Sequence, residues 1–293
     1  MNAAVNDAFK PLRSVLYMPS SNERALEKAK TLPADAIIFD LEDSVAPDAK
    51  PSAREAACAA VASGEYGERQ LIIRVNGIGT EWHAEDIAAA AAAGPDVVLV
   101  PKVNSAEEVL TLVDALAAAG APETTTLWAM VETPIGMLNA LAIATASERL
   151  TGFVMGTNDL VKELYAEHVP GRAPVITGLG LALLAARAAS IAIVDGVYND
   201  VKDTEGFLAE CEQGRQMGFD GKTLIHPGQV EGANTAFAPS EQAVADARGL
   251  IQAWEDGKGS GVVTYNGKMV ESLHVESAQR TLQIDEAIRA LQA

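Results

Sequence analysis

The sequence predicts an α/β fold of the TIM type, a (β/α)8 barrel followed by a C-terminal helical lid segment. Its expected strands are nearly continuous apolar runs, which is typical of strands buried on both faces of a parallel sheet. Helical patterns separate these runs, so strand and helix alternate along the chain. The length of 293 residues, 48% of them hydrophobic, suits one large barrel. We assign residues 1–239 to the barrel and 240–293 to the lid segment.

The expected strands share a short β-branched or apolar run that ends in a polar residue. They are residues 14–18, 36–41, 71–75, 97–100, 126–131, 152–155, 191–194 and 223–225. An open doubly wound sheet is the main alternative. It is disfavoured because no Gly-x-Gly-x-x-Gly motif follows the first strand, where that fold usually binds a dinucleotide.

The expected helices carry recognisable start and stop signals. They are residues 22–30, 52–63, 80–93, 105–119, 134–145, 180–190 and 204–217. Ser105 with Glu108 and Ser52 with Glu55 have the capping-box spacing, and Pro134 suits a first helical turn. Glycines follow several of these helices, as expected at helix C-termini.

The segment after the eighth strand has a different pattern. Residues 240–255 predict a helix, 256–261 a glycine-rich linker, 262–265 a short strand and 275–291 a terminal helix. This tail is too short to bury a core of its own. A glycine-hinged segment of this kind is typical of a lid over an active site.

Composition narrows the class of partner. The formal net charge of −18 and the pI of about 4.6 argue against nucleic acid or an anionic membrane, because both would be repelled by the average surface. Two cysteines, Cys58 and Cys211, are too few for a disulfide framework. The N-terminus lacks a signal-peptide pattern and no run is long enough to span a bilayer, so we expect a cytoplasmic protein.

Two acids follow neighbouring strands of the expected barrel. Glu132 follows the fifth strand and Asp159 the sixth. All strand carboxyl ends open on one face of a barrel, so these carboxylates would lie side by side. Mg²⁺ typically takes one or two carboxylates, with water and substrate completing its octahedron. The alternative for either residue is an ordinary surface acid.

Basic side chains end the third and fourth strands. Arg74 could bind a carboxylate through two hydrogen bonds or stabilise an enolate oxygen. Alternatively it could pair with the acids of the stretch 40–43 to neutralise buried charge. Lys102 is ambiguous in the same way, and could instead be a Schiff-base amine if its pKa were depressed.

Other catalytic classes find little support. His226 ends the eighth strand, where it could transfer protons or simply hold a loop by hydrogen bonding. No His/Cys cluster suggests zinc. A Gly-x-Ser-x-Gly elbow and a P-loop are both absent from the sequence, which disfavours a serine hydrolase and a nucleoside triphosphatase.

Several ordered motifs resemble the citrate lyase β-subunit and malyl-CoA lyase family, within the HpcH/HpaI aldolase superfamily. They are residues 16–20 (LYMPS), 40–47 (DLEDSVAP), 73–77 (IRVNG), 100–102 (VPK), 131–134 (VETP), 156–160 (GTNDL), 225–227 (IHP) and 265–269 (YNGKM). The resemblance runs from about Arg13 to the end of the tail.

The resemblance implies a trimeric or hexameric enzyme whose cofactor is Mg²⁺. Such an enzyme cleaves a 3-hydroxyacyl-CoA thioester of the malyl-CoA or citramalyl-CoA type into an acyl-CoA and a 2-oxo acid such as glyoxylate or pyruvate. By the same resemblance Glu132 and Asp159 would bind the metal and Arg74 would contact the thioester or enolate oxygen. Tyr17 and Lys28 match positions that contact coenzyme A, and we expect His226 to contact the substrate.

The chain departs from the family pattern in the lid. The family uses the Asp of a Gly-Lys-Met-Ile-Asp motif from an adjacent subunit as the proton donor, whereas this chain has Glu271 at that place, one methylene longer. Asn22 also replaces an Arg that some relatives use for coenzyme A. A malyl-CoA thioesterase, a citryl-carrier-protein lyase subunit and a barrel that binds ligands without turnover therefore remain as alternatives to the lyase.

Overall fold

The computed structural model describes residues 10–257 and 262–292. The chain divides into two compact units, Leu12–Phe237 and a C-terminal unit formed by the segment after Phe237. Within the described ranges, no helix combines the length and the apolar character needed to cross a bilayer.

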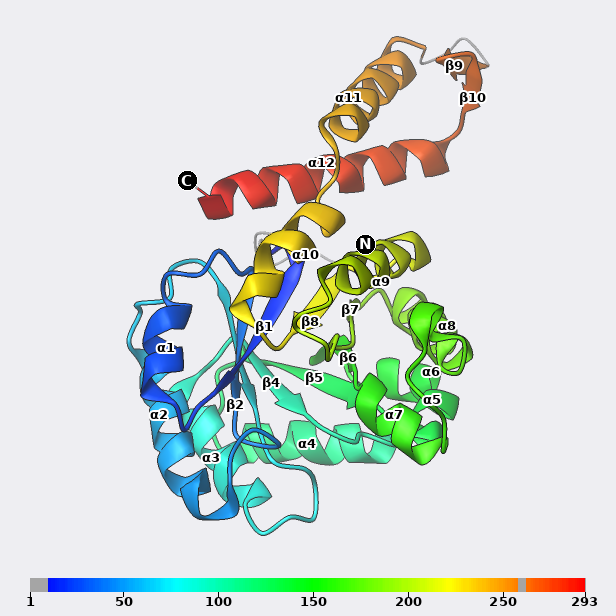
Figure 1. Ribbon diagram of the computed structural model, residues 1–293. Helices are drawn as coiled ribbons and strands as arrows, with labels where there is room; N and C mark the ends of the chain where they lie inside the picture. The colour runs from blue at the N-terminus through cyan, green and yellow to red at the C-terminus, as the bar shows by residue number, and fades with distance from the viewer. Residues whose placement is uncertain (1–9, 258–261, 293) are drawn as a thin grey trace. The chain divides into compact units, whose positions relative to one another are not determined.

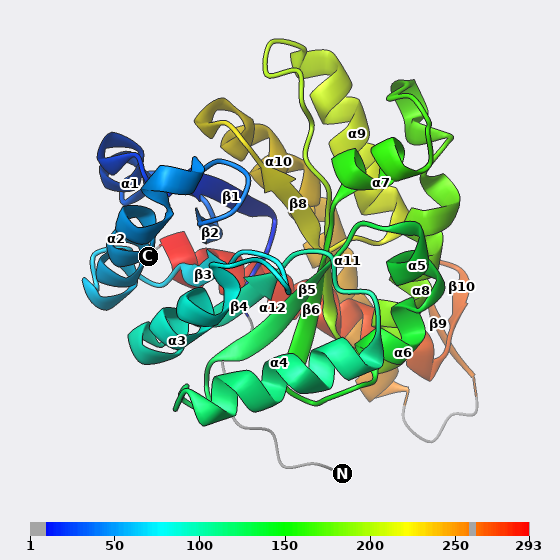
Figure 2. The same ribbon diagram turned by 90° about the horizontal axis from the view of Figure 1, so that it is seen from below.

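The first unit is a closed barrel of parallel strands joined in sequence order, with β8 paired to β1 (Figure 1). The strands are β1 (Ser14–Pro19), β2 (Ala36–Asp40), β3 (Gln70–Arg74), β4 (Val97–Val100), β5 (Thr126–Val131), β6 (Leu150–Met155), β7 (Ala192–Asp195) and β8 (Gly221–Leu224). Figure 2 shows helices arranged around the outside of these strands. The predicted barrel is confirmed.

Helices follow the strands as expected, with several differences in detail. They are α1 (Glu23–Ala29), α2 (Lys50–Ala62), α3 (His83–Ala93), α4 (Ala106–Ala118), α5 (Pro134–Leu138), α6 (Ala140–Ala144), α7 (Thr157–Glu163), α8 (Ile176–Ala189), α9 (Thr204–Met217) and α10 (Val230–Phe237). The helix expected over 134–145 breaks at Asn139, whose backbone leaves the helical region while its side chain donates to the Asn104 carbonyl. Helices α7 and α10 were not predicted from the sequence.

The capping signals gave one correct and one wrong boundary. Ser105 accepts a hydrogen bond from the backbone N–H of Glu108 and begins α4 as expected. Ser52 does not cap a helix, because α2 already begins at Lys50 after the 3₁₀ turn η1 (Pro47–Ala49). The Ser52 hydroxyl instead donates to the Ala49 carbonyl inside the first turn.

The barrel has an inner and an outer apolar layer, because alternate side chains of each strand point to opposite faces. Val15, Ile38 and Leu99 belong to the inner cluster around Trp128. A β-carbon at Gly152 would lie 2.5 Å from the Trp128 indole, so glycine makes room for this ring. The outer cluster lies between strands and helices and holds most of the buried residues.

The seam between β1 and β8 also depends on a glycine. Ser14 pairs with Lys222, and the Lys222 N–H donates to the Arg13 carbonyl. A β-carbon at Gly221 would overlap the backbone carbonyl of Leu12. Close backbone approach therefore excludes a side chain at the point where the barrel closes.

The C-terminal unit packs two helices with a hairpin between them. It comprises α11 (Glu241–Asp256), β9 (Val263–Tyr265), β10 (Lys268–Val270) and α12 (Ser272–Gln292). Asn266 and Gly267 both have positive φ, as a two-residue hairpin turn requires. Strand β10 was not predicted, and α12 begins earlier than expected. Residues 258–261 of the expected linker lie outside the described residues.

Candidate active site

A cavity of about 280 Å³ lies at the carboxyl ends of the barrel strands. Its walls come from side chains that are far apart in sequence, among them Tyr17, Asp40, Asp43, Arg74, Glu132, Thr157, Asp159 and Val197. The structure therefore brings together Arg74, Glu132, Asp159 and Tyr17, four of the residues selected from the sequence.

Glu132 is a buried carboxyl group fixed from two sides. It follows β5, is 3% exposed, and its Oε1 accepts the backbone N–H of Lys102 at 2.8 Å. A β-carbon at Gly156 would overlap Oε2, so this glycine creates the space that the carboxyl group occupies. Burial, followed by the negative charges of Asp159 and Glu42, raises the pKa of Glu132 to about 8. A cation bound here would stabilise the ionised form of Glu132, which burial and these charges disfavour.

Asp159 lies in the first turn of α7, beside Glu132. Its carboxylate pairs with the Lys102 ammonium, with 3.1 Å between Oδ1 and Nζ. Burial lowers the pKa of Lys102, but the hydrogen bond and charge of Asp159 outweigh it and raise this pKa. A Schiff-base lysine needs a depressed pKa, so the structure disfavours that alternative for Lys102.

The donor set at this position suits a magnesium ion. No group of three or more His, Cys, Asp or Glu side chains that could hold a metal occurs among the residues described. Two carboxylates, Glu132 and Asp159, are nevertheless the typical protein contribution to a Mg²⁺ site, where water and substrate supply the other oxygens. The raised pKa of Glu132 is the observation that favours a cation here.

Arg74 is held rigidly at the end of β3. Its Nε and Nη2 donate to the two oxygens of Asp40 at 2.6 and 2.7 Å, and its Nη1 lies 2.8 Å from Oε2 of Glu42. The guanidinium also stacks on the Tyr17 ring at 4.7 Å. Burial raises the pKa of Asp40, but Arg74 outweighs it and holds this pKa below its usual value. Arg74 thus pairs with acids, as one of the two sequence interpretations expects, and it also lines the cavity. Its contact with the substrate stays a prediction.

Glu42 is a titratable group that the sequence suggested only as an ion-pair partner. Burial is the largest influence on it and Arg74 opposes this, but the charges of Asp43 and Asp40 add to burial and raise the pKa of Glu42 to about 7. The signal for this was the stretch 40–43, where three acids flank one leucine near a single arginine. Whether such a cluster of acids raises the pKa of Glu42 depends on how deeply the side chain is buried, which the sequence does not show.

Two predicted site residues do not line this cavity, and a third belongs to the other unit. Lys28 is exposed in the last turn of α1 and does not line the cavity. His226 is exposed and uses Nδ1 to accept the N–H of Gly228, capping a 3₁₀ turn, as in the loop-holding alternative. Glu271 belongs to the C-terminal unit, where it is exposed between β10 and α12. Their substrate or catalytic roles stay predictions.

Comparison with known proteins agrees with this geometry. The sequence model of the HpcH/HpaI aldolase/citrate lyase family matches residues 13–227, which is nearly the whole barrel unit. The chain belongs to this family. The resemblance seen in the sequence motifs is thereby confirmed, and the HpcH/HpaI family is one of enzymes.

Curated relatives within the HpcH/HpaI aldolase/citrate lyase family carry two different names. The chain is 54% identical over 285 residues to a (3S)-malyl-CoA thioesterase of Cereibacter sphaeroides, covering 97% of this chain and 98% of the relative. It is 38% identical over 277 residues to the citrate lyase subunit beta of Escherichia coli, covering 92% of each.

Solved structures of the same family share the fold. A structure of CitE from Mycobacterium tuberculosis, in complex with magnesium, acetoacetate and coenzyme A, matches with a TM-score of 0.75 and 30% identity, covering 95% of this chain and 99% of that one. A second CitE structure contains magnesium and pyruvate, with a TM-score of 0.69 and 29% identity over 92% of this chain and 99% of that one.

Proposed function

We propose that the protein hydrolyses the thioester bond of a 3-hydroxyacyl-CoA, with (3S)-malyl-CoA as the substrate and Mg²⁺ as the cofactor. The observation that carries this proposal is the 54% identity, over nearly the full length of both chains, to a relative named (3S)-malyl-CoA thioesterase. The products are free coenzyme A and malate. Carbon-carbon cleavage, the leading expectation from the sequence motifs, becomes the second candidate.

Glu132 and Asp159 would hold the magnesium ion. When bound, the ion would supply a positive charge that neutralises and orients the hydroxy acid end of the substrate, leaving the thioester carbonyl to Arg74. Glu132 is ready for this role because the Lys102 N–H and the space at Gly156 fix its carboxyl group in one place. Lys102 neutralises Asp159 in the metal-free protein, and a bound cation would take over that role.

Arg74 would orient the thioester and stabilise the oxyanion formed when water attacks its carbonyl. Asp40 fixes the guanidinium plane through two hydrogen bonds, so little reorganisation is needed as charge develops. The neighbouring Glu42, with a pKa of about 7, can accept a proton from the attacking water near neutral pH.

The second candidate is the Mg²⁺-dependent lyase reaction, which yields acetyl-CoA and glyoxylate, or pyruvate from a citramalyl-CoA. It is favoured by the 38% identity to a citrate lyase subunit beta and by the position of Arg74, which could equally stabilise a thioester enolate. Both reactions share their substrate and differ only in the bond that breaks.

Product analysis separates the two candidates. Purified protein is incubated with Mg²⁺ and (3S)-malyl-CoA, and products are resolved by chromatography and thiol titration. Free coenzyme A with malate is the expected result. Acetyl-CoA with glyoxylate would contradict the proposed hydrolysis and support the lyase reaction. Activity only on thioesters of an acyl-carrier protein would favour a citrate lyase subunit. If Mg²⁺ and the thioester bind but no product forms, the protein is a barrel that binds ligands without turnover.

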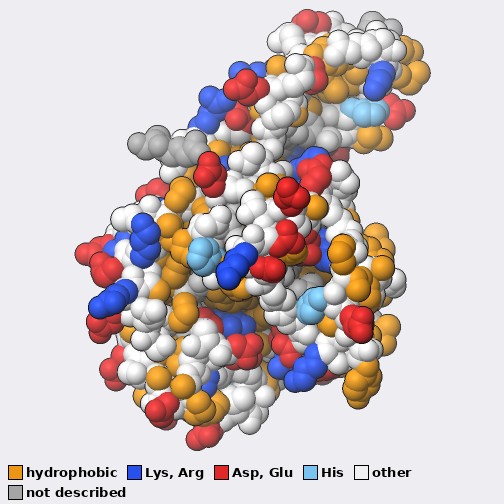
Figure 3. Space-filling view, viewed as in Figure 1, with side chains coloured by type: hydrophobic (Ala, Val, Ile, Leu, Met, Phe, Trp, Pro, Cys, Tyr) orange, Lys and Arg blue, Asp and Glu red, His pale blue; other side chains and the backbone are white. Residues whose placement is uncertain are grey.

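We further propose that the protein forms a homo-oligomer and works in the cytoplasm. Large apolar side chains are exposed along α5, α6 and α8, including Leu138 at 75%, Leu184 at 71% and Leu141 at 56%. Figure 3 shows hydrophobic side chains gathered on the right of the barrel, where these helices lie. An apolar area of this kind is typical of a protein interface.

The proposed cytoplasmic location is supported by two free cysteines, Cys58 and Cys211, because unpaired cysteines suit a reducing compartment.

A further inference from the structure

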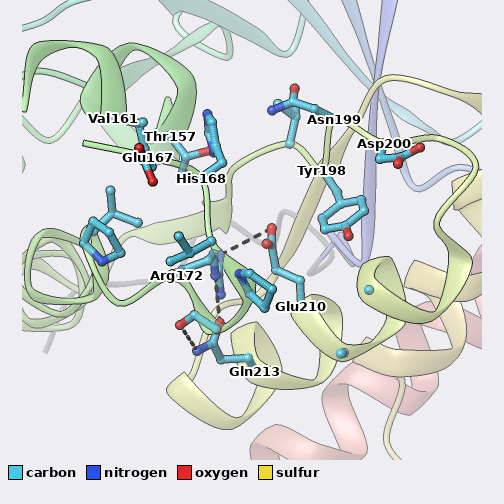
Figure 4. Close-up of a pocket in the computed structure, with 18 of the residues that line it drawn as sticks. Thr157, Val161, Glu167, His168, Arg172, Tyr198, Asn199, Asp200, Glu210 and Gln213 are labelled. Atoms are coloured by element: carbon cyan, nitrogen blue, oxygen red, sulfur yellow. Dashed lines mark hydrogen bonds and ion pairs between the residues drawn. The ribbon is translucent and has the colours of Figure 1, made fainter. Parts of the chain in front are cut away.

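Two lysines are buried among the residues that the structure describes, Lys50 and Lys222. Lys222 has carboxylate partners, since its Nζ lies 3.2 Å from Asp195 and 2.7 Å from Glu210. Figure 4 shows Glu210 beside Arg172, which also pairs with Asp195, in the wall of a cavity of about 410 Å³. The charges of this cluster balance, so pairing explains why Lys222 can be buried.

Lys50 is buried without such a partner. Its Nζ donates to the backbone carbonyls of Leu41 and Glu42, at 2.9 and 3.0 Å, and lies 4.8 Å from the centre of the Trp82 ring. Within the described ranges it forms no ion pair with a carboxylate. As the first residue of α2, it also lies at the helix end where a positive charge is disfavoured. The two carbonyls are therefore what this ammonium is placed to bind.

The carbonyls belong to the segment that carries Glu42, residues 41–44. A cavity of about 510 Å³ borders this segment and is lined by Glu42 and Asp43, together with Lys50 and Trp82. Because Glu42 faces open space on this side, packing against other side chains cannot fix its position there. Hydrogen bonds to the backbone must do so instead.

Two side chains provide these hydrogen bonds. The Asp40 carboxylate accepts the N–H groups of Glu42 and Ser44 at 2.9 and 3.1 Å, and it also accepts from Arg74. Lys50 ties the carbonyls of the same segment to the start of α2. With both ends held, Oε2 of Glu42 lies 2.8 Å from Nη1 of Arg74.

We propose that Lys50 is a positioning residue, whose ammonium binds the carbonyls of Leu41 and Glu42 and thereby keeps the Glu42 carboxyl group against Arg74. The proposal rests on the proposed function, in which Glu42 and Arg74 act on the thioester. In the described part of the chain, Lys50 has no hydrogen bond or ion pair with Arg74, Glu132 or Asp159. Its effect on the reaction must therefore pass through Glu42.

A double-mutant cycle tests this role. Lys50→Met keeps a long unbranched side chain but removes the ammonium, while the two carbonyls keep second donors in Asn76 and Val45. We expect kcat for consumption of (3S)-malyl-CoA to fall about tenfold or more while KM changes less than about twofold, because a misplaced Glu42 impairs the reaction rather than binding. In the Glu42→Gln background, the same substitution should change kcat less than about twofold.

Lys222→Met is the matched control, because it also removes a buried ammonium. It should lower the melting temperature, and any effect on kcat should be equal in the wild-type and Glu42→Gln backgrounds, since Lys222 has no contact with the segment 41–44. If Lys50→Met does not fold, Lys50→Gln replaces it, because it retains a polar end that is too short to reach both carbonyls. The same pattern of kcat values is expected.

Crystal structures of the variants give a measurement that does not depend on activity. The distance between Oε2 of Glu42 and Nη1 of Arg74 should exceed hydrogen-bonding range in the Lys50 variant and stay at 2.8 Å in Lys222→Met. The proposal is overturned if this pair stays intact in the Lys50 variant, if kcat is unchanged, or if kcat falls equally in both backgrounds.

The same experiments separate the role of Lys50 from the proposed function. Consumption of the thioester is measured whichever bond breaks, so a lyase reaction leaves the cycle valid. If no thioester is consumed, the proposed function fails, and the crystal structures still decide whether Lys50 holds Glu42 in place.

Discussion

At the scale of single residues, the most informative feature is that Glu132 holds its proton near neutral pH. Its pKa of about 8 lies well above the usual 4.5, chiefly because of burial. The folded state therefore binds this proton more tightly than the unfolded chain. For the metal-free protein, the contribution of Glu132 to the free energy of unfolding is greatest below pH 4.5 and declines as pH rises through about 8.

This pKa predicts a pH-dependent affinity for magnesium. Because the metal must displace the proton on Glu132, the Mg²⁺ association constant should rise roughly tenfold per pH unit from pH 6 toward 8 and then level off. Calorimetric titration in buffers of different ionisation enthalpy would measure both the affinity and the proton released.

A conservative variant provides the control for the pH experiment. Glu132→Gln keeps the volume of the side chain but removes the titrating group. It should lower Mg²⁺ affinity and kcat/KM, each by at least about 100-fold, and should abolish the pH dependence that levels off near 8. An unchanged pH profile in this variant would assign the metal site to other residues.

At the scale of elements, the turn between β6 and α7 decides the geometry of the site. Gly156 is placed so that any β-carbon would overlap the Glu132 carboxyl group. Gly156→Ala should therefore displace Glu132 and lower kcat/KM by about 100-fold or more, while circular dichroism still reports a folded barrel.

The matched control for that substitution is Gly180→Ala in α8. No atom lies within 4 Å of a β-carbon built at Gly180. This variant should keep full activity and gain roughly 0.5–1 kcal/mol of stability, because alanine suits a helix interior better than glycine. Equal activity of the two variants would mean that the space at Gly156 is unimportant.

The element formed by the β9–β10 hairpin and the start of α12 carries Glu271. If this acid acts in the reaction, its length should influence which bond breaks. We expect Glu271→Asp, which restores the acid of the family motif, to raise the ratio of acetyl-CoA to free coenzyme A. Glu276→Asp, on an exposed part of α12, should leave the ratio unchanged. A constant ratio in both variants would remove Glu271 from the mechanism.

At the scale of the whole molecule, the exposed leucines of α5, α6 and α8 predict self-association. Replacing Leu184 with Glu places a charge in that apolar area and should shift the mass measured by light scattering toward a monomer. Val201→Glu, at a 45% exposed position outside these helices, is the control. An unchanged mass for Leu184→Glu would place the oligomer interface elsewhere.

Much of the barrel was predictable because buried parallel strands have apolar runs that few other elements share. The short elements were not: α7 spans seven residues and has no side-chain cap, and β10 spans three. The Arg74–Asp40 pair could be anticipated, because these residues end adjacent strands and are paired in register. The pKa of Glu42 could not, since it depends on burial by residues far away in sequence.

The contact between the first and last strands has a consequence for synthesis of the protein. Translation proceeds from the N-terminus, so β1 waits on the ribosome until β8 has emerged, roughly 200 residues later. At ordinary elongation rates this interval is on the order of 10–40 s. An unpaired strand is a template for association with other chains. The nascent polypeptide therefore has an unpaired strand edge, and a need for chaperones, until β8 emerges and closes the barrel.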